Sequence, residues 1–318
     1  MRRFLLSAAL VLACGILASS LALAAEEEII YAGEDPETAG ITLGGWGSGA
    51  ALLNTKEGTA GPNAIEVRTD GYYSGARIDF SKPVDLSDAL ANGKNVDLVL
   101  TFRIPSLAGE SEAGGYTTYG PRTGYAPGSP YSGYRPGGGA PTASTETPTP
   151  LISYMRVVLV VNGSKLVAED QPLDYSTLEE GVLNVAIPLA AFQGQQPTTK
   201  PALLQRILIF GDRTASIYLG EIRTAVDDEE ITVEPLDEME INTGDRTEFT
   251  AHAEGGLSPL EYVWDFDASD GIQEEAYGPT VYHTYRKPGD YTVTVTVRDI
   301  NHVKPPAKAE AVISVAQQ

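Results

Sequence analysis

The sequence predicts an all-β protein with two successive domains, a jelly-roll-like β-sandwich followed by an immunoglobulin-like β-sandwich. Two observations support this fold class. Short runs of alternating apolar and polar residues, rich in β-branched side chains, recur along the chain between clusters of Gly, Pro, Asn and Asp. No long stretch shows the 3.6-residue apolar period of an amphipathic helix. Many short strands joined by turns are typical of sandwiches.

Residues 1–25 have the layout of a secretory signal peptide. Arg2 and Arg3 give a positive start, an apolar run follows, and Ala22–Ala24 offers a small-x-small cleavage site before Glu26. We therefore expect a secreted or cell-surface protein that has no membrane span once the signal is removed. The alternative is an uncleaved membrane anchor.

Cys14 is the single cysteine of the chain. The preceding Val11-Leu12-Ala13 loosely resembles a bacterial lipobox, so a lipidated N-terminus is the alternative to simple secretion. Cleavage near Ala24 would remove this cysteine and leave a mature chain without disulfides. Its stability must then come from buried apolar surface, and its length is sufficient for two cores.

The chain is strongly acidic, with 22 basic and 43 acidic residues and a net charge of −21 at pH 7. The negative electrostatic potential of such a chain repels nucleic acid and anionic membranes, so we expect neither as a partner. Cations are compatible with it, and structural calcium is therefore one expectation. The alternative is an acidic surface that only interacts with water.

The first predicted domain spans residues 26–227. Its alternating, strand-like runs are 64–69, 76–80, 96–102, 156–161, 182–187, 205–210 and 216–222. Short helical turns are expected at Leu86–Ala91 and Leu189–Phe192. The runs before and after a low-complexity stretch are too few to form a sandwich alone. We therefore expect one domain with an insertion, and not two domains with a linker.

The insertion covers residues 107–150 and is rich in Gly, Pro, Ser and Thr. Aliphatic side chains are nearly absent after Ala113, so no core can form and disorder is expected. Its aromatic and basic residues are Tyr116, Tyr119, Arg122, Tyr125, Tyr131, Tyr134 and Arg135. These side chains could serve a flexible contact arm through stacking and cation–π contacts. The alternative is an ordinary surface loop.

The second predicted domain spans residues 228–318 and contains seven short strands. Trp264 and Phe266 share one face of a strand and are expected to fill the core between two sheets. Pro288–Asp290 predicts a tight turn into the next strand. Tyr291, which begins that strand, is expected to donate its hydroxyl to a nearby backbone carbonyl, as a tyrosine corner does.

Four motifs of this second domain resemble the PKD (polycystic kidney disease) domain family. They are V-W-D-F at Val263–Phe266, H-T-Y at His283–Tyr285, P-G-D-Y-T-V at Pro288–Val293 and V-R-D at Val297–Asp299. Their order and spacing agree with the family. The resemblance implies an immunoglobulin-like spacer or contact module in which His283 is structural. One difference is the loop Asp267–Gly271, which is longer and more acidic than the Gly-Asp-Gly usual in the family.

The acidic loop of the second domain supplies candidate metal ligands. Calcium prefers carboxylate oxygens, which this domain supplies at Asp265, Asp267, Asp270 and Asp299. Some PKD-like domains resemble calcium-binding domains, so the resemblance makes these residues candidate calcium ligands. The alternative is that these carboxylates accept hydrogen bonds from loop amides.

The first domain has a looser resemblance to the galactose-binding-like jelly rolls of carbohydrate-binding modules. The segments that carry it are Trp46, Ile65–Val67, Tyr73–Ala76 and a closing pair of strands at Gln205–Phe210 and Ile217–Ile222. The resemblance implies sugar binding and an acidic residue in the last strand beside a structural calcium. Glu221 occupies that position, where the pattern more often has Asp.

Sugar binding requires aromatic platforms, because the C–H faces of pyranose rings stack on aromatic rings while polar groups contact the hydroxyls. The candidate platform residues are Trp46, Tyr72, Tyr73 and Tyr154. The alternative for each is ordinary packing in the core or at a sheet edge.

No enzyme is expected. All three histidines lie in the second domain, which excludes Ser-His-Asp, Cys-His and histidine-zinc sites in the first domain. Nucleophile-elbow, phosphate-loop and dinucleotide motifs are absent from the sequence. A paired-carboxylate glycosidase stays open as an alternative, since Asp and Glu are abundant.

We expect a binding protein for a polysaccharide or cell-surface glycan. The alternative is a structural surface or matrix protein that contacts other surface proteins.

Overall fold

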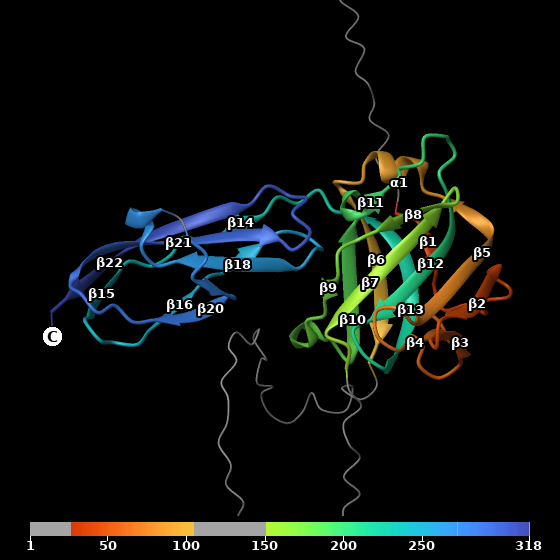
Figure 1. The fold of residues 1–318 in the computed structure, drawn as a ribbon, viewed down its shortest axis with the longest axis horizontal. Coiled ribbons are helices and arrows are strands. Elements are labelled where there is room, and N and C mark those ends of the chain that lie inside the picture. Colours follow the sequence, from red (N-terminus) through yellow and green to blue (C-terminus); the bar gives the residue numbers. More distant parts are fainter. Residues whose placement is uncertain (1–26, 105–150, 272, 318) are drawn as a thin grey trace, which may run out of the picture.

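The computed structural model describes residues 27–104, 151–271 and 273–317. Two β-sandwich domains follow each other along the longest axis of the molecule (Figure 1). The predicted signal peptide, Cys14 and the insertion 107–150 lie outside the described residues. Within these residues, no helix has both the length and the apolar character needed to cross a membrane.

One sheet of the first domain has six strands. They are β1 (Ile29–Tyr31), β3 (Ala50–Asn54), β4 (Ala64–Thr69), β6 (Val96–Arg103), β10 (Val182–Pro188) and β13 (Ala215–Val226). Their order is β10-β6-β13-β4-β3, and β1 pairs with the later part of β13. All pairings in this sheet are antiparallel.

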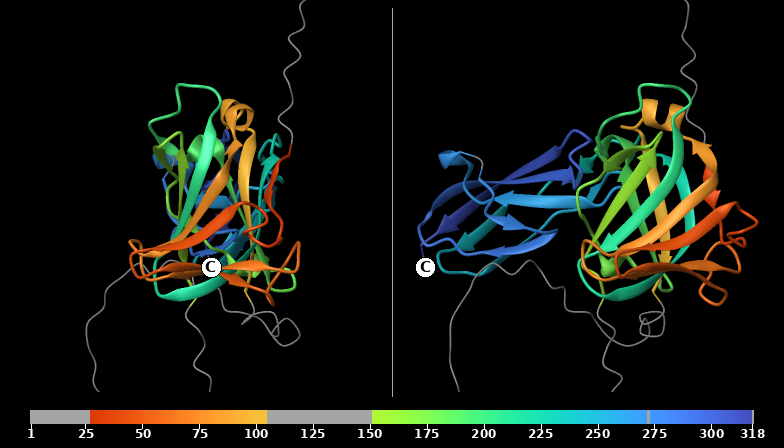
Figure 2. Two further views of the ribbon diagram at one scale, coloured as in Figure 1. Left: turned by 90° about the vertical axis from the view of Figure 1, so that its right-hand side faces the viewer. Right: turned by 45° about the vertical axis from the view of Figure 1, so that its right-hand side comes forward.

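The second sheet of the first domain has seven strands. They are β2 (Ile41–Trp46), β5 (Gly75–Asp85), β7 (Tyr154–Val161), β8 (Ser164–Val167), β9 (Gln171–Pro172), β11 (Gln193–Gly194) and β12 (Leu203–Gly211). Their order is β11-β8-β7-β12-β5-β2, and β9 pairs with β7. The two sheets pack face to face, as a second view of the domain shows (Figure 2). This domain is therefore an antiparallel sandwich.

The core of the first domain lies between the two sheets. Alternation along β12 illustrates how it forms, because Ile207 and Ile209 point inward and are fully buried, while Leu208 and Phe210 point to the outer face. The expected short helical turns are present as α1 (Ser87–Ala91) and the 3-10 turn η2 (Leu189–Ala191). A further 3-10 turn, η1, covers Tyr175–Thr177.

The expected closing pair of strands is wrong. β12 lies in the seven-stranded sheet between β7 and β5, whereas β13 lies in the six-stranded sheet between β6 and β4. The turn between them therefore crosses from one sheet to the other. Alternation predicts that both segments are strands, but it carries no information about which strands pair.

The second domain centres on a five-stranded sheet. Its strands are β15 (Met239–Asn242), β18 (Leu260–Asp265), β19 (Ala276–Tyr277), β21 (Gly289–Asp299) and β22 (Ala307–Ala316), in the order β15-β22-β21-β18-β19. Two short ladders complete it: β14 (Thr232–Val233) with β17 (Ala253–Glu254), and β16 (Thr247–Thr250) with β20 (Thr280–His283). A 3-10 turn, η3, covers Ala268–Asp270. The strand β15 is parallel to β22.

Trp264 is the centre of the second core, as its position in the sequence predicts. Its side chain is 0 % exposed, and its Nε1–H donates to the carbonyl of Gly278 at 2.8 Å. The rings of Phe249 and Phe266 pack beside it, with centroids 6.1 and 6.4 Å away. Aromatic packing and one satisfied indole N–H therefore fix the interior of this domain.

The turn before β21 differs slightly from the prediction. The hydroxyl of Tyr291 donates to the carbonyl of Lys287 at 3.0 Å, which confirms the expected bond back to the backbone. The strand already begins at Gly289, which lies opposite Val315. The chain therefore bends at Lys287 and not over Pro288–Asp290.

A buried lysine joins the two domains. Lys304 is 9 % exposed, and its Nζ donates to Asp227 Oδ1 at 2.6 Å and to the carbonyls of Glu229 and Gly255 at 2.8 and 2.7 Å. The other carboxylate oxygen of Asp227 accepts from the backbone N–H of Leu257. Three acceptors compensate the ammonium for its loss of water, so this contact fixes the junction between the domains.

Candidate functional site

The four predicted platform residues lie at one end of the seven-stranded sheet. Trp46 ends β2, and Tyr154 begins β7. Tyr72 and Tyr73 belong to the turn between β4 and β5, and Ser74 separates them from Gly75, where β5 begins. The fold therefore gathers residues that are more than a hundred positions apart in the sequence.

At this end of the sheet, the strand register places residues from four neighbouring strands in one row. Trp46 lies opposite Gly75, Gly75 opposite Phe210, and Phe210 opposite Arg156. Directly opposed residues point to the same face of a sheet. Phe210 faces away from the core, so Trp46 and Arg156 do as well. The guanidinium of Arg156 lies 4.9 Å from the ring centroid of Tyr72, which adds a tyrosine to this outer face.

Hydrogen bonds connect the two turns that carry the aromatic residues. Ser48, just after β2, donates its hydroxyl to Asp70 at 2.6 Å and lies 3.1 Å from the hydroxyl of Ser74. Thr214, after β12, also donates to Asp70 at 2.6 Å. The hydrogen bonds from Ser48 and Thr214 lower the pKa of Asp70, so this carboxylate stays ionised and fixes three loops together.

Three of the four rings are open to solvent. Trp46 is 41 % exposed, Tyr73 85 % and Tyr154 44 %, whereas Tyr72 is half-buried. Exposed aromatic side chains at one end of a sheet are unusual for packing alone and fit a flat ligand that stacks on them.

The outer face of this sheet is curved. The Nζ of Lys165, on β8, lies 5.5 Å from the ring centroid of Trp46, on β2. Three strands separate β8 from β2. In a flat sheet these two strands would lie about 19 Å apart, since neighbouring strands are about 4.8 Å apart. The contact therefore requires the sheet to curl toward its outer face.

Ion pairs line this outer face beside the rings. Asp79 on β5 contacts two guanidinium groups, Arg77 Nε at 2.9 Å and the Nε of Arg206 on β12. Arg156 binds Asp170 through two hydrogen bonds, at 2.7 and 3.0 Å. No sequence motif pointed to these residues as part of a site. Alternation places Arg77 and Asp79 on one face of a strand, but their distant partners depend on how the strands pair.

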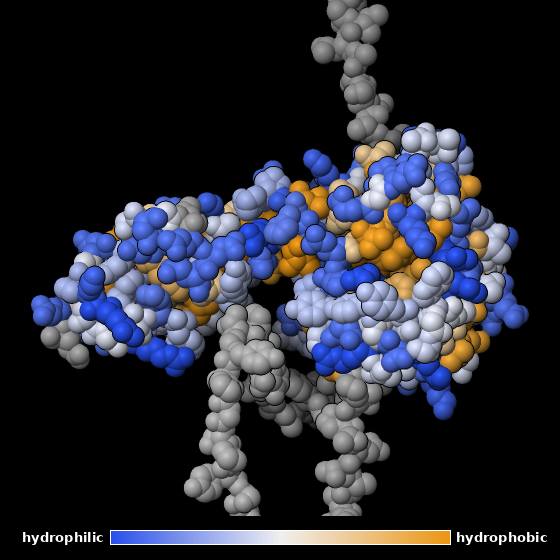
Figure 3. Space-filling view, in the orientation of Figure 1, coloured by the Kyte–Doolittle hydropathy of each residue, from blue (hydrophilic) through white to orange (hydrophobic). Residues whose placement is uncertain are grey.

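Apolar side chains form the floor between these ion pairs. Val158, Leu208 and Phe210 are buried although they point away from the core, and Val167 packs against them. An apolar patch bordered by hydrophilic residues is visible on the near face of the first domain (Figure 3). Polar groups beside a water-poor floor interact more strongly with a ligand than groups in open solvent.

The candidate calcium ligands are not gathered into one site. Glu221 lies on β13, where its nearest cationic group is Arg223 Nε at 3.3 Å. Asp265 and Asp267 lie in the other domain, where they accept backbone N–H bonds from Asp267, Gln273 and Ser269. Asp270 lies in η3 beside them. Among the described residues, no three His, Cys, Asp or Glu side chains form a metal-binding group.

Asp299 also serves a loop, because its carboxylate accepts the backbone N–H groups of Asn301 and Lys304 at 2.9 and 2.7 Å. His283 stacks on Phe266 at 4.2 Å between ring centroids and meets Tyr285 edge-on at 4.5 Å. Burial lowers the pKa of this histidine, so it is neutral at pH 7. These contacts show structural roles for Asp299 and His283.

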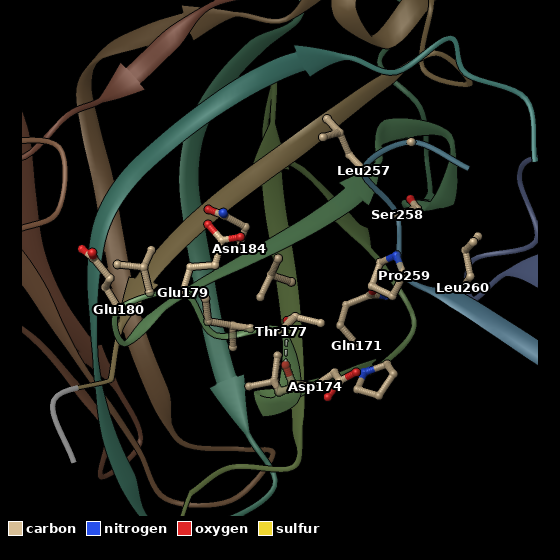
Figure 4. A pocket seen from close by; sticks show the side chains of 16 residues that line it. Gln171, Asp174, Thr177, Glu179, Glu180, Asn184, Leu257, Ser258, Pro259 and Leu260 are labelled. Atoms are coloured by element: carbon tan, nitrogen blue, oxygen red, sulfur yellow. Dashed lines mark hydrogen bonds between the residues drawn. The ribbon is translucent and has the colours of Figure 1, made fainter. Parts of the chain in front are cut away.

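A cleft of about 900 Å³ lies between the two domains. One side consists of Gln171–Asp174, Thr177, Glu179, Glu180 and Val182–Val185, and the other of Gly256–Leu260 (Figure 4). Its charged residues are Asp174, Glu179 and Glu180, and the described lining contains no aromatic and no basic side chain. The carboxylate of Asp174 caps η1 by accepting from Ser176. The described residues of this cleft therefore offer no ring on which a sugar could stack.

Comparison with known proteins identifies the second domain. Residues 232–315 match the family model of the PKD domain. The PKD domain of human KIAA0319 is similar at 21 % identity, over 28 % of this chain and 83 % of that one, with a TM-score of 0.23. Fibronectin(III)-like modules of Clostridium thermocellum CbhA are similar at 15 % identity, over 55 % and 83 % of the two chains, with a TM-score of 0.23.

A third solved structure contains the M60 catalytic domain and the CBM51-1 and CBM51-2 domains of Clostridium perfringens ZmpB. It is 10 % identical, over 87 % of this chain and 22 % of that one, with a TM-score of 0.20. A search of curated proteins gave no match.

Proposed function

We propose, from the premise that residues 232–315 are a PKD domain, that this chain is a non-enzymatic extracellular binding protein whose first domain binds carbohydrate. The ligand lies on the outer face of the seven-stranded sheet, at the end that carries Trp46. The PKD domain acts as a spacer that holds this face at a fixed orientation.

One observation carries the proposal. Trp46, Tyr72, Tyr73 and Tyr154 come from three separate segments and meet at one end of one sheet, where three of the rings are exposed. The ion pair of Arg156 with Asp170 lies beside them. Rings that stack on sugar C–H faces, next to charged groups that bind hydroxyls, are the two elements that carbohydrate recognition needs.

The distribution of chemical groups favours binding over catalysis. The three histidines lie in the PKD domain, and His283 is held in its aromatic core. On the outer face, each carboxylate that we have described is paired with arginine, as Asp79 and Asp170 are. The oxygens of both carboxylates are engaged by guanidinium groups, so they do not form the free pair of carboxylates that a glycosidase uses.

The proposal is tested by affinity gel electrophoresis of the protein against a panel of soluble polysaccharides. We expect Trp46→Ala and Tyr73→Ala each to weaken retention about tenfold, because loss of a stacked ring removes roughly 1–1.5 kcal/mol of binding free energy. Matched controls are Tyr277→Ala and Tyr282→Ala. These tyrosines are 47 and 49 % exposed but belong to the PKD domain, so their variants should be retained like the parent.

Two outcomes would contradict the proposal. Equal retention of the four variants would remove the platform from the binding site. Absence of retention on every polysaccharide, together with concentration-dependent self-association, would instead favour a structural surface protein that works by protein contacts.

A further inference from the structure

Basic side chains gather on the outer face of the seven-stranded sheet, although the chain as a whole is acidic. Its strands contribute Arg77, Arg156, Lys165 and Arg206, and the accompanying carboxylates are Asp79 and Asp170. The complete chain has 22 basic and 43 acidic residues. The local excess of positive charge is therefore opposite in sign to the charge of the molecule.

The centre of this excess is a carboxylate shared by two arginines. Asp79 contacts the Nε atoms of both Arg77 and Arg206. One carboxylate neutralises only one of the two guanidinium charges. Neither arginine donates a hydrogen bond from its Nη atoms to another described residue, although each guanidinium carries five N–H donors. Donors and one positive charge are thus left for a ligand.

Gly44 explains how Arg77 lies on the sheet. The two residues are opposite each other on β2 and β5. A Cβ atom at position 44 would lie 2.8 Å from Nη2 of Arg77, so a larger residue would push the guanidinium away. The missing side chain lets this group lie across β2, on the same face as Trp46 two positions further along.

In addition to the two arginines, a lysine ammonium lies beside the exposed aromatic rings. Lys165 Nζ is above the ring of Trp46, and no carboxylate in the described part of the chain lies within ion-pairing distance of it. An anion that pairs with this ammonium would lie beside the ring on which a sugar stacks. The cations and the stacking surface are therefore arranged for one ligand.

We propose that this outer face binds a polysaccharide that carries anionic groups, either carboxylate or sulfate. Arg77, Arg206 and Lys165 hold the anions, and Trp46 stacks on a sugar ring. The inference rests on the proposed carbohydrate-binding function and adds the class of ligand. Hydrogen bonds from guanidinium to an anion are shorter and about twice as strong as those between neutral groups, so a neutral polysaccharide would leave this arrangement unused.

Matched pairs of polysaccharides test the inference by affinity gel electrophoresis. Dextran and dextran sulfate differ only in sulfate, and highly methyl-esterified pectin and polygalacturonate differ in free carboxylate. We expect retention at least about tenfold stronger on the charged member of one pair, and a decrease of that retention as salt rises to about 0.5 M, since salt screens charge interactions. The pair that shows the difference identifies the anionic group.

Three substitutions assign the effect to the site. Arg77→Gln and Arg206→Gln should each weaken retention on the charged polysaccharide about tenfold, as loss of one charge-assisted contact predicts. Asp79→Asn removes the competing carboxylate and should strengthen retention severalfold. The matched control is Arg68→Gln, because Arg68 pairs with Glu66 at 2.7 Å on the other sheet and should have no effect. A thermal melt of each variant verifies folding.

The results separate the inference from the function on which it rests. Retention on neutral and charged members alike would overturn the anionic class while carbohydrate binding stands. No retention on any polysaccharide would overturn both. Retention on charged members that is unchanged in Arg77→Gln and Arg206→Gln, or that is weakened equally by Arg68→Gln, would show that general charge and not this face is responsible.

Discussion

At the scale of single residues, the two tryptophans have opposite roles. Trp264 is fully buried in the PKD core, with its N–H bonded to a carbonyl, whereas Trp46 is 41 % exposed on the outer face of the first domain. The same residue type therefore supplies stability in one domain and a candidate binding surface in the other. Its surroundings decide the role, because replacement of the buried indole leaves a cavity and a carbonyl without its donor, whereas replacement of the exposed indole leaves neither.

We predict that Trp264→Phe lowers the free energy of unfolding by about 2–3 kcal/mol, since a smaller ring leaves a cavity and the carbonyl of Gly278 loses its donor. Urea unfolding followed by circular dichroism measures this change. Trp46→Phe is the matched control, and its exposed ring predicts a change below about 0.5 kcal/mol. A similar loss of unfolding free energy in both variants would contradict the assignment of a structural role to Trp264 alone.

At the scale of elements, the junction of β2, β5 and β12 positions the candidate site. Gly75 lies between Trp46 on β2 and Phe210 on β12. A Cβ atom at this position would lie only 2.0 Å from the carbonyl oxygen of Ile209. The close approach of two backbones requires glycine here, and this approach sets the row of residues at the candidate site.

We predict that Gly75→Ala lowers the free energy of unfolding by about 3 kcal/mol, because the strands must separate to admit the methyl group. Gly71→Ala in the preceding turn is the comparison. Its φ is +75° but nothing lies within 4 Å of a Cβ atom there, so only about 1 kcal/mol of backbone strain is expected. If urea unfolding gave the same loss of unfolding free energy for both variants, the close backbone contact at Gly75 would not be the cause.

At the scale of the whole molecule, the domain junction contains a buried carboxylate that lacks full compensation. Asp97 is 1 % exposed, and one of its oxygens lies 3.3 Å from the hydroxyl of Ser258 in the other domain. Its other oxygen has no hydrogen-bond partner among the described residues. Burial raises the pKa of Asp97 to about 7, with a further contribution from Asp227 and a smaller one from Asp299, while Lys304 and Ser258 act in the opposite direction.

This raised pKa predicts how stability depends on pH. The pKa of an unfolded Asp is about 3.9, so the folded protein binds this proton more tightly. The favourable contribution is therefore complete below pH 4 and is lost as the pH rises from about 4 to about 7. Asp97→Asn should be more stable than the parent at pH 8, and its stability should fall less between pH 4.5 and 8.

Urea unfolding at several pH values measures both effects. The matched control is Asp88→Asn, because the Asp88 side chain is 67 % exposed and its change should leave the pH profile unaltered. Parallel profiles for the parent and Asp97→Asn would show that this carboxylate does not carry the pH dependence.

The sequence alone determined the local features of this protein. Period-2 alternation predicted seven strands of the first domain, but not β1, β2, β3, β8, β9 or β11. The short-range motifs around Trp264 predicted the PKD domain, its buried tryptophan and the hydroxyl bond of Tyr291. These features depend on neighbours in the chain, so they can be recognised without knowledge of the fold.

Only the tertiary structure decided which strands lie side by side. It placed β12 and β13 in opposite sheets, and it brought Asp79 to Arg206, which is 127 positions away. The pairing of distant strands depends on the packing of whole sheets, and alternation is the same for every possible partner. The aromatic platform was therefore foreseen as separate residues, while the charged face beside Trp46 became visible only once the sheet had formed.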